Sequence, residues 1–185
     1  MMPDYSNGSF VGYLPHNPRA VATKGGLAPE QIHMTGRYLG SADTLDIVNF
    51  ANASRVINEE CMNIPTVKVS EWRIKWLGDV EVRDAGLIAA VLNCDPEPLQ
   101  AMHDVVCDIL DDHDLPNASE FKVWVPHITL EYIGIAEAEK KWPEGHKVIQ
   151  PIIIDRVVCA LGDSWTYAHL NRKDLTAQLD DDSIE

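Results

Sequence analysis

The stretch QIHMTGRYLG, residues 31–40, is the most informative part of the chain, because a related stretch, PHITLEYIG, occupies residues 126–134. Each stretch contains His-x-Thr, first as His33 and Thr35 and then as His127 and Thr129, and each continues to an aromatic residue, an aliphatic residue and Gly. Side chains at positions i and i+2 of a β-strand lie on one face. We therefore expect two strands, each presenting an imidazole beside a hydroxyl, that together form a phosphate site.

Paired imidazoles and hydroxyls are suited to cleaving a phosphodiester without a metal ion. One histidine can take a proton from the nucleophile while the other protonates the leaving oxygen, because the histidine pKa lies near neutrality. The threonine hydroxyls can donate to the phosphoryl oxygens, where negative charge accumulates. One His-x-Thr alone is more often structural than catalytic, but two copies with similar continuations favour a catalytic set. We predict His33, Thr35, His127 and Thr129 as catalytic residues, with no metal and no cofactor.

Length and composition indicate one domain. The chain has 185 residues, of which 45% are hydrophobic, enough for a single core. We expect one bilobed domain over residues 1–175 and an acidic, flexible tail over residues 176–185, which contain DDDSIE. Residues 1–8 have no basic n-region and no apolar h-region, so we expect no signal peptide, and no run approaches the roughly 18 apolar residues of a membrane span. The four cysteines are widely spaced, which favours reduced core thiols. A cytoplasmic protein without a membrane partner is the resulting expectation.

The formal net charge of −14 restricts the partners. Affinity for long nucleic acids comes mainly from clustered Lys and Arg, so an acidic chain argues against such a partner. A small phosphorylated ligand remains compatible with this charge. The composition leaves the oligomeric state open.

The hydrophobic pattern predicts a mixed α+β fold. A helix is expected from an N-cap at Asp43 to about Cys61, and a second helix opens at Asp95-Pro96, with apolar residues at a period of 3.6. The segment 15–29, rich in Pro and Gly, is expected to be a loop and a candidate lid. Because strands and helices do not alternate strictly, we expect antiparallel-rich sheets with helices on their outer faces. Strands are expected at residues 10–14, 31–40, 66–77, 80–93, 121–133, 148–161 and 165–169.

The two motifs make the chain resemble the two-histidine (2H) phosphoesterase superfamily, which includes RNA 2′,5′-ligase-like proteins, 2′,3′-cyclic phosphodiesterases and phage enzymes that destroy cyclic-nucleotide immune signals. A weaker likeness is that of IDRVV at residues 154–158, followed by LGD at residues 161–163, which resembles the closing strands of actinobacterial and phage members. The resemblance to the superfamily implies a two-lobed, pseudo-twofold fold with a central groove. Gly36 departs from the family, which usually has an aliphatic residue there, and predicts looser packing behind the first motif.

Five further residues are candidates for substrate binding. Arg37 and Glu131 have the same strand parity as the motif residues, so they could contact the substrate in the groove or pair with each other. Tyr13, Trp76 and Trp124 could stack on a nucleobase.

Three hypotheses follow for function. The first is a metal-independent phosphodiesterase that cleaves a small nucleotide, such as a cyclic oligonucleotide, a 2′,3′-cyclic phosphate or a 2′,5′-linked nucleotide. The second is a protein that sequesters a nucleotide without turnover. The third is an enzyme that processes RNA ends, which the net charge of −14 disfavours.

Overall fold

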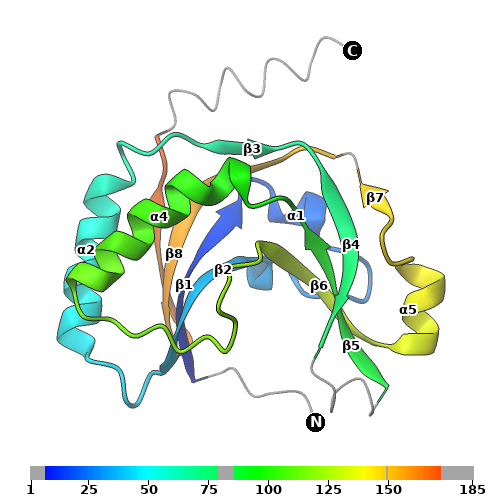
Figure 1. Ribbon diagram of the computed structural model, residues 1–185, viewed down its shortest axis with the longest axis horizontal. Coiled ribbons are helices and arrows are strands. Elements are labelled where there is room, and N and C mark those ends of the chain that lie inside the picture. Colours follow the sequence, from blue (N-terminus) through cyan, green and yellow to red (C-terminus); the bar gives the residue numbers. More distant parts are fainter. Residues whose placement is uncertain (1–6, 79–85, 149, 172–185) are drawn as a thin grey trace.

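A computed structural model describes residues 7–78, 86–148 and 150–171 (Figure 1). Within these residues, nine antiparallel strands form one sheet in the order β3-β8-β1-β2-β6-β5-β4-β7, with β9 paired to β8. The strands are β1 (Gly8–Pro15), β2 (Met34–Ser41), β3 (Val67–Val69), β4 (Trp72–Leu77), β5 (Leu87–Asn93), β6 (His127–Gly134), β7 (Lys147–Val148), β8 (Ile152–Leu161) and β9 (Ser164–His169). The helices are α1 (Pro18–Val21), the 3₁₀ helix η1 (Pro29–Gln31), α2 (Ile47–Glu60), α4 (Glu97–Asp112) and α5 (Ile135–Lys141).

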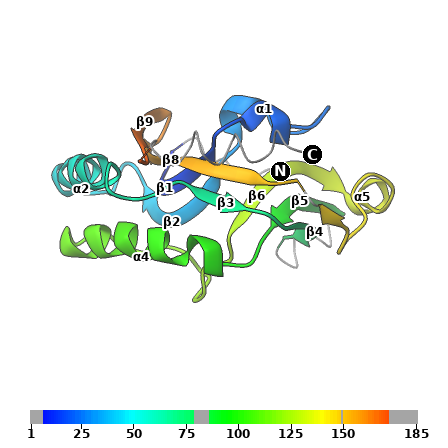
Figure 2. The ribbon, with the colours of Figure 1, turned by 90° about the horizontal axis from the view of Figure 1, so that it is seen from above.

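The sheet has two halves that meet where β2 pairs with β6. One half contains β3, β8, β1 and β2, and the other contains β6, β5, β4 and β7. Helices α2 and α4 lie beside the first half, and α5 lies at the far end of the second (Figures 1 and 2). The predicted α+β class, with antiparallel strands and peripheral helices, is confirmed.

Helices α2 and α4 follow the predicted apolar period. Leu99, Met102 and Val106 of α4 are buried in the same core as Ile57 of α2. The cap of α2 differs from the prediction: the side chain of Asp46, not that of Asp43, accepts hydrogen bonds from the first-turn amides. Among the described residues, no helix has both the length and the apolar character needed to cross a membrane.

Several predicted boundaries were wrong. The expected strand 66–77 is interrupted at Ser70 and Glu71, so that β3 pairs with β8 while β4 pairs with β5. Of the expected strand 121–133, only the part from His127 is a strand, and α5 was not predicted. The structure describes residues 7–78, 86–148 and 150–171 of the expected bilobed domain, 1–175. The expected tail, 176–185, lies outside the described residues. All four cysteines are free; Cys61, Cys94 and Cys159 are buried as predicted, whereas Cys107 is only half-buried.

The segment 15–29 is packed against the sheet. It contains α1, and its Leu27 amide donates to the carbonyl of Leu130 in β6 at 2.8 Å. Gly26 permits this approach, because a Cβ at that position would lie 2.4 Å from the same carbonyl oxygen. The segment predicted as a candidate lid is therefore bound to β6 in this structure.

The packing behind the first motif is tight, contrary to the expectation from Gly36. A Cβ on Gly36 would lie 2.8 Å from the ring of Tyr13, which is completely buried. The Tyr13 ring therefore occupies the space that an aliphatic side chain would need.

We predict that Gly36→Ala lowers the free energy of unfolding by about 1–3 kcal/mol, because the added methyl group must displace the buried Tyr13 ring. Urea denaturation measures the change. Gly134→Ala is the matched control, since its Cβ would meet nothing closer than 3.5 Å. Equal effects of the two substitutions would contradict the packing argument.

Candidate active site

The two His-x-Thr motifs lie side by side at the junction of the two halves of the sheet. Met34 of β2 is the antiparallel partner of Ile128 of β6. In this register, His33 lies across from Thr129, and Thr35 lies across from His127. Met34 and Ile128 are both buried in the core that includes the α4 side chains. The four predicted residues therefore share the opposite face of the sheet, which we call the motif face.

Both imidazoles are oriented by the same local hydrogen bond. Nδ1 of His33 donates to the carbonyl of Gln31 at 2.8 Å, and Nδ1 of His127 donates to the carbonyl of Val125 at 2.8 Å. A carbonyl oxygen can only accept, so Nδ1 carries the hydrogen in each ring. This arrangement leaves Nε2 of each ring to take up or release a proton.

The surroundings favour neutral imidazoles. Burial lowers the pKa of both His33 and His127 from 6.5, because it penalises the charged form, and the backbone hydrogen bonds oppose this effect. Positive charge on His127 lowers the pKa of His33 further, so the two rings lie within electrostatic reach of each other. At neutral pH each ring is therefore ready to act as a base.

A β-bulge follows each threonine and reverses the facing of the next side chain. In β2, Thr35 pairs with Gly12 and Arg37 pairs with Val11, so Gly36 is the extra residue. Because Gly12 and Val11 point to opposite faces, Thr35 and Arg37 also point to opposite faces. The predicted position of Arg37 on the motif face was therefore wrong.

The second motif has the equivalent bulge. In β6, Thr129 pairs with Val91 and Glu131 pairs with Ala90, so Leu130 is the extra residue. Glu131 consequently faces away from the motif face, and its predicted position was also wrong. Counting alternate residues along the sequence assigned Arg37 and Glu131 to the wrong face, because each follows a β-bulge.

Arg37 and Glu131 each hold a motif strand to a helix, and they do not pair with each other. The Arg37 guanidinium contacts the Asp111 carboxylate at 2.6 Å and donates to the Leu115 and Pro116 carbonyls, which ties β2 to the end of α4. The Glu131 carboxylate accepts from Lys141 at 2.6 Å and from the Trp142 indole at 3.1 Å, which ties β6 to the end of α5.

The three aromatic residues predicted to stack on a base also lie away from the motif face. The hydroxyl of the buried Tyr13 forms a hydrogen bond of 2.8 Å with Nδ1 of His103. Trp124 stacks on His103, with centroids 3.7 Å apart, and its indole donates to the Thr35 carbonyl at 3.0 Å. Trp76 pairs with Ala90 and donates to the Trp142 carbonyl. Their positions give them structural contacts, and Trp124 supports the backbone of Thr35 directly.

A different set of aromatic side chains surrounds His33. Phe10 stacks on the imidazole with centroids 4.7 Å apart, and Trp165 contacts it edge-on at 5.5 Å. Tyr167 lies on the same face as Trp165, because side chains at positions i and i+2 of a strand such as β9 point to one face. The alternation of Trp165 and Tyr167 is visible in the sequence. Which strand pairs with theirs, and so brings them to His33, is not.

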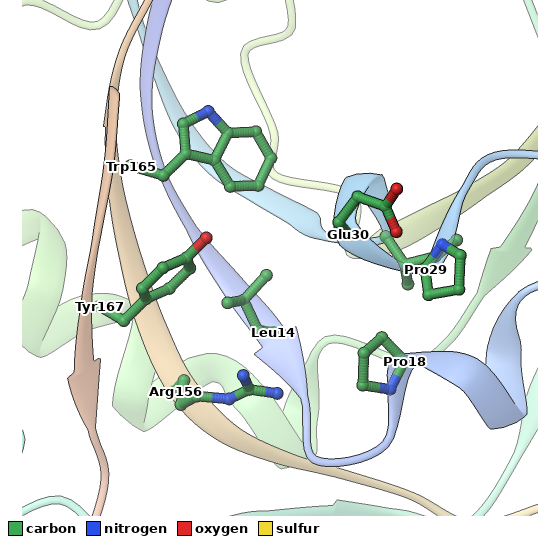
Figure 3. A pocket seen from close by; sticks show the side chains of 8 residues that line it. Leu14, Pro18, Pro29, Glu30, Arg156, Trp165 and Tyr167 are labelled. Carbon is green, nitrogen blue, oxygen red and sulfur yellow. The ribbon is translucent and has the colours of Figure 1, made fainter. Parts of the chain in front are cut away.

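A pocket opens next to this aromatic group (Figure 3). Trp165 and Tyr167 form one side of it, and Glu30 and the prolines form the other. Arg156 lies between them, held by Asp155 at 2.9 Å. The full lining is Leu14, Pro18, Pro29, Glu30, Ile32, Arg156, Trp165 and Tyr167.

Comparison with solved structures identifies the fold. Over 89% of this chain, Usb1 of Kluyveromyces marxianus superposes with a TM-score of 0.51 and 12% identity, covering 99% of that chain. TT0787 of Thermus thermophilus superposes with a TM-score of 0.52 and 14% identity, covering 89% of this chain and 98% of that one. Usb1 with uridine monophosphate gives a TM-score of 0.50 and 11% identity, covering 91% and 100%. No protein-family model and no curated protein sequence matches the chain. The chain has the 2H phosphoesterase fold.

We predict that the stability of the protein falls as the pH decreases from 6.5 to 4, in part because of His103. Burial lowers the pKa of His103 to about 4, so the unfolded chain binds its proton first. The free energy of unfolding should lose about 3 kcal/mol from this residue over that interval, which is present in full above pH 6.5. Urea denaturation as a function of pH measures the loss.

The control for this prediction is His103→Gln. The slope of the free energy of unfolding against pH is compared with that of the wild type, and not the free energy itself. The variant should show a flatter dependence on pH between 6.5 and 4, whatever its stability at pH 7. An unchanged slope would show that His103 is not the titrating group.

Proposed function

We propose that this protein is a metal-independent phosphodiesterase that acts on a small nucleotide. The observation that carries the proposal is the register of β2 and β6, which sets His33 beside Thr129 and His127 beside Thr35 on one face. Each histidine keeps Nε2 for proton transfer, because its Nδ1 hydrogen is held by a backbone carbonyl. Two oriented imidazoles and two hydroxyls supply an acid, a base and phosphate donors.

The reaction depends on the linkage that is bound. For an RNA-type linkage, Nε2 of one histidine removes the proton of the neighbouring ribose hydroxyl, whose oxygen attacks phosphorus. The bond to the leaving oxygen breaks, and Nε2 of the other histidine, protonated beforehand, supplies the proton that this oxygen needs. A 2′,3′-cyclic phosphate is opened in the same way, with water as the nucleophile. Thr35 and Thr129 donate to the non-bridging oxygens.

The lowered pKa values of the two histidines fit the role of the base. The bound substrate stabilises the protonated imidazole that the role of the acid requires. Burial keeps both rings neutral in the free protein. A phosphate anion bound between them favours a protonated imidazole, because opposite charges stabilise each other. One ring then carries the proton that the leaving oxygen needs.

The surroundings support a nucleotide as the substrate. Trp165, Tyr167 and the adjoining pocket offer aromatic faces next to His33, and bases stack on such faces. A Usb1 structure of the same fold contains uridine monophosphate. The net charge of −14 favours a short nucleotide over a long RNA. Cyclic oligonucleotides of the kind used as immune signals belong to this substrate class, and the four free thiols suit a reducing cytoplasm.

We predict that His33→Ala and His127→Ala each reduce kcat by about 10²–10⁴-fold, because each removes a proton-transfer group. The assay uses 2′,3′-cyclic mononucleotides, 2′,5′- and 3′,5′-linked dinucleotides, and cyclic di- and trinucleotides, with excess EDTA throughout. Circular dichroism confirms that each variant is folded. His146→Ala, an exposed histidine outside the motifs, is the control and should retain wild-type activity.

Two outcomes of this assay favour the alternatives. Stable binding with complete recovery of intact nucleotide indicates sequestration. Turnover of structured RNA ends, with no turnover of any small nucleotide, indicates RNA-end processing. Wild-type rates in both folded histidine variants would end the acid–base proposal.

We predict a bell-shaped dependence of kcat/KM on pH with its optimum below pH 6.5. This profile reports the free protein, in which burial lowers the pKa of both histidines from 6.5. The alkaline limb of kcat should lie at higher pH than that of kcat/KM, because bound phosphate raises the pKa of the acid. Steady-state rates from pH 4.5 to 9 measure both limbs, and an optimum of kcat/KM above pH 6.5 would contradict the prediction.

A further inference from the structure

Two basic side chains of β4 lie on the motif face, on the His127 side. In the sheet register, His127 pairs with Asn93, and Asn93 pairs with Arg73. In the next row, Thr129 pairs with Val91, and Val91 pairs with Lys75. Paired residues of neighbouring strands point to the same face. Arg73 and Lys75 therefore face the same side as the second motif.

These two cations are exposed, and no carboxylate of the described residues forms an ion pair with them. Their neighbours Trp72 and Ile74 are buried on the other face, which fixes the outward direction of Arg73 and Lys75. Within the described ranges, neither side chain is part of an ion pair, whereas Lys147, opposite Arg73, pairs with Glu71. In a chain of net charge −14, two such cations beside the motifs form a distinct basic site.

The basic site lies one strand away from His127, because β5 separates β4 from β6. Adjacent strands are about 4.8 Å apart, so the backbone of Arg73 is about 10 Å from that of His127, with Asn93 between them. The phosphate that reacts must lie between the two imidazoles. A group that Arg73 and Lys75 contact is therefore a second anion of the same ligand.

The two walls of the site differ in chemistry. On the side of β9, Trp165 and Tyr167 offer aromatic faces, and on the side of β4, Arg73 and Lys75 offer positive charge. Strands β9 and β4 lie on opposite sides of the β2–β6 junction (Figure 2). A ligand across the motifs would thus have its base on one side and its additional charge on the other.

We propose that Arg73 and Lys75 form a second phosphate subsite, so that the substrate carries at least one phosphate besides the one that is cleaved. Phosphorylated dinucleotides and linear or cyclic oligonucleotides meet this requirement, whereas a 2′,3′-cyclic mononucleotide does not. The inference rests on the proposed function for the position of the reacting phosphate.

The test compares pairs of dinucleotides that differ only in a terminal phosphate. Dinucleotides with 2′,5′ or 3′,5′ linkages are assayed without a terminal phosphate, with a 5′-phosphate and with a 3′-phosphate. In the wild type, we expect one phosphorylated form to raise kcat/KM by about tenfold, the size expected from two exposed charge pairs. The ratio of the two kcat/KM values should fall as salt is added.

The variant and its control remove the same charge from different faces. Arg73→Gln with Lys75→Gln should reduce the ratio to about one while leaving the rate on the unphosphorylated dinucleotide near that of the wild type. Arg55→Gln with Lys140→Gln removes two cations from α2 and α5 and should keep the ratio of the wild type. A ratio of one in the wild type, or an equal ratio in both double variants, would overturn the subsite.

Failure of this inference is distinguishable from failure of the proposed function. Turnover of 2′,3′-cyclic mononucleotides, with no preference for a terminal phosphate, retains the acid–base proposal and overturns the subsite. If no nucleotide is turned over, calorimetric binding of the phosphorylated dinucleotides still decides the subsite. Tighter binding to the wild type than to Arg73→Gln with Lys75→Gln would support it, and equal binding would overturn it.

Discussion

The antiparallel register between Met34 of β2 and Ile128 of β6 is the constraint on which the rest of the structure depends. This contact joins the two halves of the sheet and places both motifs on one face. A shift by one residue would turn the histidine and threonine of that strand into the core. The burial of Met34 and Ile128 specifies the register, because a slip by one residue would replace an apolar side chain in the core by a polar one.

The residues behind the motif face keep this register rigid. Arg37 holds β2 to α4, Glu131 holds β6 to α5, and each follows a bulge directly after a motif threonine. Trp124 adds a hydrogen bond to the carbonyl of Thr35. Arg37, Glu131 and Trp124, which the sequence predicted as substrate contacts, thus support the motif strands from the opposite face. Such supporting contacts hold proton-transfer groups in a fixed position.

The two halves share this frame but differ in the side chains that surround the motifs. His33 is enclosed by Phe10 and Trp165, whereas the strands beside His127 present Arg73 and Lys75. An approximately symmetric pair of histidines therefore lies in an asymmetric site. A nucleotide is itself asymmetric, with an apolar base at one end and phosphate charge at the other, so the two walls would orient it.

Local periodicity in the sequence is sufficient to assign which side chains share a face within a short regular segment. The sequence identified the two His-x-Thr pairs and the apolar stripe of α4, because each depends only on local periodicity. Tertiary structure decided where that periodicity is interrupted and which strands are neighbours. The bulges at Gly36 and Leu130 reversed Arg37 and Glu131, and the pairing of β9 with β8 brought Trp165 to His33. A bulge is defined by its partner strand, and contacts between distant strands depend on the packing of the whole sheet.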